Sequence, residues 1–220
     1  MSISKIKTVS RQPLNVVVYE NIKSAIVSGE IKAGTRLTET AVSEQMNVST
    51  TPVREAFRRL ASEGLMKIIP WRGAIVQEFS SQEILEVYQC REALEVKAIQ
   101  LATDHIDPEG IEQLRSLLKR SETATDHTEY AEINTEMHEL FFEYSRNATL
   151  IKLIHQINDV ILHNRSISAY SDKRKEEILK EHDKIITALD RKNKNEAAQA
   201  MKEHIENGYE YIKSRFKEDL

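Results

Sequence analysis

Hydrophobic residues recur at helical spacing in successive segments near the start of the chain. Apolar positions between Val17 and Val27 predict a first helix, and Gly29 and Gly34 break the pattern after it. Thr38 is placed to cap a second helix. The apolar positions of this second helix are Ala41, Val42 and Met46. The chain therefore begins with two short helices, which a third follows.

The third helix has a signal at each end. Ser49 or Thr50 is expected to cap its first N–H groups, and Pro52 has a backbone angle suited to the first turn. Glu55 is expected to complete a capping box, and Gly64 ends the helix. Its apolar face consists of Val53, Ala56, Phe57 and Leu60. Its remaining surface carries Thr50, Thr51, Arg54, Arg58 and Arg59, so one side packs and another is free to meet phosphates.

A β-hairpin is predicted directly after this helix. The β-prone runs 66–69 and 74–76 are separated by Pro70, Trp71, Arg72 and Gly73, which form a turn with a basic tip. Three helices followed by a hairpin predict a winged helix-turn-helix, whose third helix enters the major groove of DNA while the wing lies near the backbone or minor groove. The alternative is a small helical domain whose third helix merely happens to be basic.

The N-terminal part resembles the DNA reader of GntR-type transcriptional regulators over roughly residues 19–79. The segments that carry the resemblance are 29–37, 51–56, 63–65 and 72–76. It implies that Arg54 reads a guanine edge or clamps a phosphate, and that Arg72 and Gly73 bring the wing to DNA. Thr50 stands where many relatives have an arginine, so we expect a different base preference. The candidate DNA-binding residues are Arg36, Thr50, Thr51, Arg54, Arg58, Arg72 and Gly73.

The pattern changes after a short linker at residues 80–82. Residues 83–220 hold only two glycines and one proline and predict an all-helical bundle. The six helices are expected at about 82–104, 108–124, 129–146, 148–170, 172–190 and 194–215. The fold class is therefore mainly α, with a flexible arm at 1–13, a winged helix-turn-helix at 14–79 and a helical domain at 83–220.

Charge separates the two parts. Residues 1–80 hold 11 Lys and Arg against 7 Asp and Glu, a net charge of +4, whereas residues 81–220 have a net charge of −8. A localised basic face favours specific DNA contact over coating of nucleic acid. The single cysteine, Cys90, excludes an internal disulfide framework, and we expect it to be buried among apolar neighbours. Without a signal peptide or an apolar run long enough to span a membrane, a cytoplasmic location is expected.

Three histidines fall on helical stripes that are otherwise apolar. His138 lies four residues after Asn134 on the third helix of the bundle, so both project from one face. His182 and His204 occupy the apolar stripes of the fifth and sixth helices. The three imidazoles are candidates to converge on a divalent metal such as zinc. Alternatively, each is a hydrogen-bonded core histidine. The other histidines, at 105, 127, 155 and 163, are interpreted as surface or structural residues.

The helical part resembles the FCD effector domain of the FadR branch of the GntR family, over roughly residues 83–213. The matching residues include Arg91 to Glu95, the Asn134 and His138 pair, Glu181 with His182, and Met201 with His204. The resemblance implies a divalent metal, zinc or nickel, held by His138, His182 and His204. Asn134 occupies the position of an acidic ligand, and losing a carboxylate should weaken metal binding.

Two arginines are also expected to point into the bundle. Arg91 follows Tyr88 on one stripe, and Arg165 follows Asn158 on another. An inward guanidinium needs an anionic partner, because a buried unpaired charge is costly. The partner is either an internal glutamate such as Glu95 or the carboxylate of a small effector. Tyr88, Arg91, Asn158 and Arg165 are therefore the candidate effector-binding residues.

These features predict a ligand-responsive transcription factor that binds a pseudo-palindromic operator on double-stranded DNA as a homodimer. The first alternative is a metal-dependent hydrolase that uses the three histidines, although the sequence has no His-Glu-x-x-His motif. The second is a DNA-binding protein whose helical part only dimerises.

Overall fold

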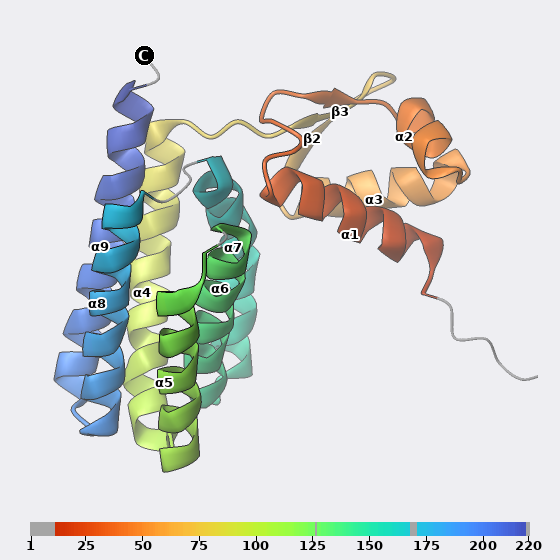
Figure 1. Cartoon of the computed structure of the whole chain (residues 1–220). Helices are drawn as coiled ribbons and strands as arrows, with labels where there is room; N and C mark the ends of the chain where they lie inside the picture. Colours follow the sequence, from red (N-terminus) through yellow and green to blue (C-terminus); the bar gives the residue numbers. More distant parts are fainter. Residues whose placement is uncertain (1–11, 126, 168–170, 219–220) are drawn as a thin grey trace, which may run out of the picture. The chain divides into compact units, whose positions relative to one another are not determined.

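Three helices and a small sheet form the N-terminal unit of the computed structural model, which describes residues 12–125, 127–167 and 171–218 (Figure 1). Their bounds are α1 Leu14–Val27, β1 Arg36–Leu37, α2 Glu39–Met46, α3 Thr50–Ser62, β2 Met66–Ile69 and β3 Gly73–Val76. The chain divides into two compact units between Glu78 and Phe79. Each unit has its own hydrophobic core.

The sheet is antiparallel with strand order β1-β3-β2. The predicted hairpin is confirmed, with Met66 opposite Val76 and Ile69 opposite Gly73. Strand β1 was not predicted, because two residues are too few to show an alternating pattern. Gly73 has a φ of +90°, and a Cβ there would lie 2.1 Å from the carbonyl oxygen of Leu37, so only glycine fits beside β1.

The start of α3 differs from the prediction. Ser49 is the N-cap residue, but its side chain makes no capping hydrogen bond, and no capping box with Glu55 forms. Pro52 is the third residue of the helix and has no N–H for the Ser49 side chain to accept from, and Glu55 lies six residues after Ser49, beyond the third helical position that a capping box requires. The end agrees with the prediction, since Gly64 follows the helix with a φ of +79°.

The apolar face of α3 is the centre of the N-terminal core. Val53, Ala56, Phe57 and Leu60 are all buried there. They pack with the buried face of α1, which consists of Val18, Tyr19, Ile22 and Ile26. Tyr19 also ties the two helices together, because its hydroxyl donates to Glu63 and the guanidinium of Arg59 lies 3.6 Å from its ring centroid. The opposite face of α3 is left to solvent.

Within the part of the chain that the structure describes, six helices form the C-terminal unit, in the predicted order (Figure 1). Their bounds are α4 Ser81–His105, α5 Pro108–Thr123, α6 His127–Tyr144, α7 Ala148–Ile167, α8 Asp172–Asp190 and α9 Lys194–Glu218. Local signals set several of these starts. Ser80 and Glu83 form a complete capping box at α4, and the side chains of Asp107 and Ser171 cap α5 and α8.

The buried face of α4 corrects one prediction. Cys90 is exposed, not buried. The core stripe of α4 at this level runs through Tyr88, Arg91 and Glu95, which are all buried. Because one helical position turns the side chain by about 100°, Cys90 faces away from this stripe, although Arg91 beside it was correctly expected to point inward. Separately, within the described ranges we find no helix long and apolar enough to cross a membrane.

Candidate functional sites

Arg54 lies on the solvent-facing side of α3 and is clamped by Glu39, the first residue of α2. Its Nε lies 2.9 Å from both carboxylate oxygens of Glu39, and its Nη2 lies 2.6 Å from Oε2. The hydrogen bonds from Arg54 lower the pKa of Glu39. Bidentate pairing fixes the plane of a guanidinium, so a flexible side chain is held in one orientation. The sequence reasoning missed Glu39, whose distance of fifteen residues from Arg54 gives no local signal.

The other predicted DNA contacts all lie in the N-terminal unit. Thr51 and Arg58 are exposed on α3, where Thr50 is half-buried. Arg36 and Arg72, which are far apart in sequence, are brought together because Nε of Arg36 donates to the carbonyl oxygen of Arg72 at 2.9 Å. β1 therefore supports the tip of the wing, beside Gly73. Recognition helix and wing each present exposed basic side chains.

His138, His182 and His204 converge inside the C-terminal unit from α6, α8 and α9. Each offers one ring nitrogen, and these nitrogens lie within 4.8 Å of one another. The ring centroids of His182 and His204 are 4.8 Å apart, and that of His138 lies 5.4 and 5.2 Å from them. All three Nε2 atoms are buried. Since Zn–N bonds are about 2.0–2.1 Å long, small ring movements would suffice to surround one ion.

Two carboxylates fix the orientation of two of these imidazoles. Nδ1 of His138 lies 2.9 Å from Oε2 of Glu95, and Nδ1 of His204 lies 2.8 Å from Oε2 of Glu181. An ionised carboxylate only accepts, so Nδ1 carries the proton and Nε2 keeps the lone pair that a metal requires. The sequence reasoning did not assign this role to either glutamate. Glu95 lies on the core stripe of α4 and Glu181 precedes His182, so the signal was present.

Each of these glutamates is also paired with a buried arginine. Nε of Arg91 donates to Oε1 of Glu95 at 2.5 Å, while Arg174 binds both oxygens of Glu181 at 2.8 and 3.0 Å. Burial opposes ionisation of Glu95, but the charge of Arg91 and the hydrogen bonds from Arg91 and His138 outweigh it and hold the pKa of Glu95 well below the usual range. The cluster therefore has two Arg–Glu–His chains, and the sequence had suggested neither Arg174 nor this symmetry.

Asn134 is buried one helical turn before His138 on α6. The amide oxygen of Asn134 would be a neutral ligand, and the three imidazoles are neutral too. Because the two Arg–Glu pairs cancel in charge, the cluster as a whole carries no net negative charge. The residues present fit a borderline cation such as zinc by ligand type, with nitrogen donors dominating. No carboxylate ligand is at position 134 to offset the charge of the ion.

The predicted effector residues divide into two groups. Tyr88 and Arg91 are buried on α4, and the guanidinium of Arg91 lies 5.5 Å from the centroid of the Tyr88 ring. The internal partner considered for Arg91 is present, since Glu95 binds it. The side chains of Asn158 and Arg165 lie outside the described residues. Of the remaining histidines, His155 is exposed and pairs with Glu139, and His105 lies in the last turn of α4.

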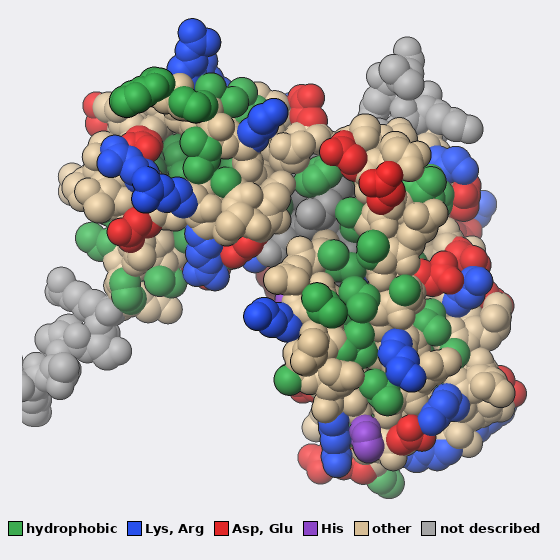
Figure 2. All heavy atoms as spheres, turned by 180° about the vertical axis from the view of Figure 1, so that it is seen from behind, with side chains coloured by type: hydrophobic (Ala, Val, Ile, Leu, Met, Phe, Trp, Pro, Cys, Tyr) green, Lys and Arg blue, Asp and Glu red, His purple; other side chains and the backbone are tan. Residues whose placement is uncertain are grey.

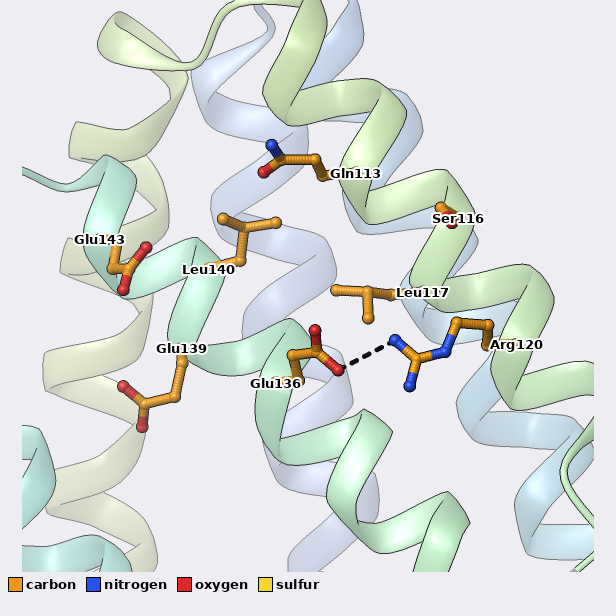
Figure 3. Close-up of a pocket in the computed structure, with 8 residues that line it drawn as sticks. All are labelled: Gln113, Ser116, Leu117, Arg120, Glu136, Glu139, Leu140 and Glu143. Carbon is orange, nitrogen blue, oxygen red and sulfur yellow. Dashed lines mark hydrogen bonds and ion pairs between the residues drawn. The ribbon is translucent and has the colours of Figure 1, made fainter.

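A surface groove of about 410 Å³ lies between α5 and α6, and neither Tyr88 nor Arg91 lines it (Figure 3). Leu117 and Leu140 line it together with an ion pair between Arg120 and Glu136 at 3.1 Å. Glu139 and Glu143 add acidic groups on the α6 side. None of the three clustered histidines lines this groove.

A winged helix with an exposed, arginine-bearing recognition helix defines the N-terminal unit as a DNA-binding module, joined in one chain to an all-helical unit. Family models match both parts: "Bacterial regulatory proteins, gntR family" over residues 7–76 and "FCD domain" over residues 86–207. The chain therefore belongs to the GntR family of transcriptional regulators and carries an FCD domain.

Individual relatives agree with this assignment. The chain is 33% identical over 205 residues to the HTH-type transcriptional regulator YdhC of Bacillus subtilis, covering 91% of this chain and 92% of the relative. It is 28% identical to the HTH-type transcriptional repressor RspR of Escherichia coli, over 89% and 87% of the two chains. The structure of McbR/YncC from E. coli has the same fold, with a TM-score of 0.81, 23% identity and coverage of 94% and 100%.

The hydrolase alternative is not supported. The family and the relatives are transcriptional regulators and not enzymes.

Proposed function

We propose that the protein binds a pseudo-palindromic operator as a homodimer and that a small carboxylate bound in the helical unit modulates this binding. The observation that supports DNA recognition is that Arg54 is exposed on α3 and is held in one orientation by its ion pair with Glu39. With Glu39 on Nε and Nη2, the N–H groups at the end of the guanidinium would meet O6 and N7 of a guanine, the commonest base-specific contact in the major groove. Thr50, Thr51 and Arg58 on the same helix would contact phosphates or a thymine methyl group.

Replacing Arg54 by alanine tests this role. We expect operator binding to weaken by roughly 1–3 kcal/mol and the preference at one base pair to relax. Arg115→Ala is the control, because Arg115 is also an exposed, ion-paired arginine but lies in the helical unit. Competition between a selected duplex and single-base variants measures both effects. Equal operator affinity for Arg54→Ala and the native protein would rule the role out.

For the helical unit, we propose that His138, His182 and His204 hold zinc or nickel through Nε2, with the amide oxygen of Asn134 as a fourth, neutral ligand. A bound metal would supply the positive charge that attracts a carboxylate. Glu95 and Glu181 would hold two imidazoles in the tautomer that binds metal. The burial of all three Nε2 atoms supports this arrangement, since water competes little there.

Tyr88 and Arg91 would complete the effector site. The bond to Glu95 uses one of the five N–H donors of Arg91, and an effector carboxylate would take others. Asn158 and Arg165 are proposed on the sequence pattern alone. The effector would act by favouring one placement of the two DNA-reading units over another, which changes their fit to paired half-sites.

We propose that the face of the helical unit seen in Figure 2 is the surface for dimerisation. Figure 2 shows hydrophobic side chains gathered along this face among charged ones. Leu153 on α7 is 44% exposed although it is large and apolar. Burial of such side chains against a second copy would favour association.

Elemental analysis of the purified protein, with His138→Ala, His182→Ala and His204→Ala variants, tests the metal site. A near-stoichiometric metal that all three variants lose would support it. Thermal denaturation with and without chelator addresses the alternative in which the helical unit only dimerises, because a ligand bound only to the folded state raises its stability by about 2.7 kcal/mol at a hundred times the Kd. Unfolding that is insensitive to added zinc and to chelator would favour that alternative.

A further inference from the structure

Trp71, the only tryptophan of the chain, is fully exposed at the tip of the hairpin between β2 and β3. Its relative exposure is 104%, and Ile68 on the neighbouring strand is 45% exposed. Among the described residues, the exposed large hydrophobic side chains are Leu14, Ile68, Trp71 and Leu153. Two of these four, Ile68 and Trp71, lie on the wing. A large aromatic side chain gains nothing from folding in this position, since its apolar surface stays in water.

The backbone at Trp71 is also unfavourable for a bulky residue. The N–H of Arg72 donates to the carbonyl of Ile69 at 3.0 Å, which closes a turn with Pro70 second and Trp71 third. Trp71 has a φ of +65°, and the third position of such a turn favours glycine or asparagine. Left-handed backbone costs a bulky L-residue on the order of 1–2 kcal/mol. Because no packing offsets this cost in the free protein, the indole is expected to act in contact with a partner.

The charge around the indole indicates what that partner is. Lys67 and Arg72 on the wing are both exposed, and Arg36 is anchored to the wing tip through the carbonyl of Arg72. The sequence between Glu63 and Glu78 contains no acidic residue. An apolar wedge between cations suits the minor groove of DNA, where the walls are sugars and the edges are lined by phosphates.

We propose that Trp71 is a DNA-contacting residue whose indole enters the minor groove beside the half-site and packs against sugars and base edges. Lys67 and Arg72 bind the flanking phosphates. This inference rests on operator binding as proposed above, and it adds a contact made by shape and apolar surface to those made by α3.

The single tryptophan makes a direct test available, since no other residue contributes indole fluorescence. The full-length protein first enriches a duplex from a pool with a randomised centre, and anisotropy of the labelled duplex then marks saturation. We expect the Trp71 emission to change on binding and to become shielded from acrylamide. Unchanged emission and quenching at saturation would overturn the proposal and assign the exposed tip to a protein partner. Failure to enrich any duplex would overturn operator binding itself.

The Trp71→Asn variant distinguishes a role of the indole in DNA contact from a role in the stability of the folded protein. Asparagine tolerates positive φ, so the variant should be at least as stable as the native protein in urea, whereas its operator affinity should fall roughly tenfold. The salt dependence of DNA binding by Trp71→Asn should stay unchanged, because no phosphate contact is lost. Arg72→Ala, by contrast, should lower the slope of log affinity against log salt concentration by about one.

Trp71→Phe should recover most of the affinity. Leu14→Asn is the control for loss of an exposed apolar side chain. Native affinity for a stable Trp71→Asn would overturn the proposal.

Discussion

Asn134 is the residue that we propose as a fourth, neutral ligand beside the three histidines. It is buried on the same face of α6 as His138. We expect Asn134→Asp to raise zinc affinity roughly tenfold or more, because a carboxylate offsets the charge of the ion that three neutral imidazoles leave in place. Calorimetric titration of the metal-free protein measures the change.

Asn147→Asp is the matched control for this prediction. Asn147 caps α7 through its side-chain oxygen, which accepts from the N–H of Leu150, and aspartate serves the same purpose. The control should therefore bind zinc as the native protein does. If Asn134→Asp also left zinc affinity unchanged, position 134 would not be a ligand.

Single residues also show where sequence patterns mislead. The stripe of α4 was correctly expected to include Tyr88 and Arg91, yet Cys90 was assigned to the core and is exposed. An apolar residue is a poor guide to the inner face when that face carries an arginine and a glutamate. The burial of Arg91 is explained only by its partner Glu95, since a paired charge can be buried where a lone one cannot.

The wing depends on one close approach between strands. A Cβ on Gly73 would lie 2.1 Å from the carbonyl oxygen of Leu37 in β1, and its φ is +90°. We expect Gly73→Ala to destabilise the N-terminal unit by about 2–4 kcal/mol through strain and displacement of β1. Urea unfolding followed by circular dichroism measures the loss.

Gly64→Ala separates strain from steric clash. Gly64 has a similar φ of +79°, but nothing lies within 4 Å of the position of its Cβ. This variant should lose only about 1 kcal/mol, the cost of left-handed backbone alone. Equal losses for both variants would mean that the contact with β1 does not constrain the wing.

The N-cap residue of helix α5 is Asp107, whose carboxyl group can gain a proton in acid. Asp107 accepts from the N–H of Gly110 at 2.9 Å and from the hydroxyl of Tyr144 at 3.1 Å, and these bonds lower its pKa below the ordinary 3.8. A lowered pKa means that the ionised form stabilises the folded state above pH 3.8 and that this contribution disappears as the pH falls through the folded-state value.

Asp107→Asn tests that sign, because asparagine caps a helix without titrating. We expect the native protein to be the more stable one at neutral pH and the difference to vanish in acid. Urea midpoints of both proteins across the acidic range provide the measurement. A difference that stayed constant with pH would show that ionisation of Asp107 does not stabilise α5.

The proposed homodimer has a consequence for operator geometry. If two DNA-reading units act together, the second half-site is bound at a high effective concentration, so a duplex with both half-sites should bind roughly a hundredfold or more tighter than one with a single half-site. Binding titrations with the two duplexes, together with sedimentation of the free protein, test this. Equal affinities would indicate that each chain binds DNA alone.

The sequence alone was sufficient for the helices, the β2–β3 hairpin and their order, but not for the two-residue strand β1. Apolar residues at helical or alternating spacing, with caps such as Ser80 and breakers such as Gly64, gave helix bounds close to those observed. It also identified the three histidines, because a polar residue on an apolar stripe stands out. These are local signals, since helix periodicity and capping act within a few residues.

Contacts between distant segments were decided only by the tertiary structure. The clamp of Glu39 on Arg54, the strand β1 beside Gly73 and the bonds from Glu95 and Glu181 to the histidines join residues that no short-range pattern connects. The absence of a capping hydrogen bond from the Ser49 side chain likewise depended on where α3 begins, because that start makes Pro52 the third residue of the helix. The pattern of apolar and polar residues along one segment determines which face of that segment is buried. Which other segment packs against this face depends on the tertiary structure.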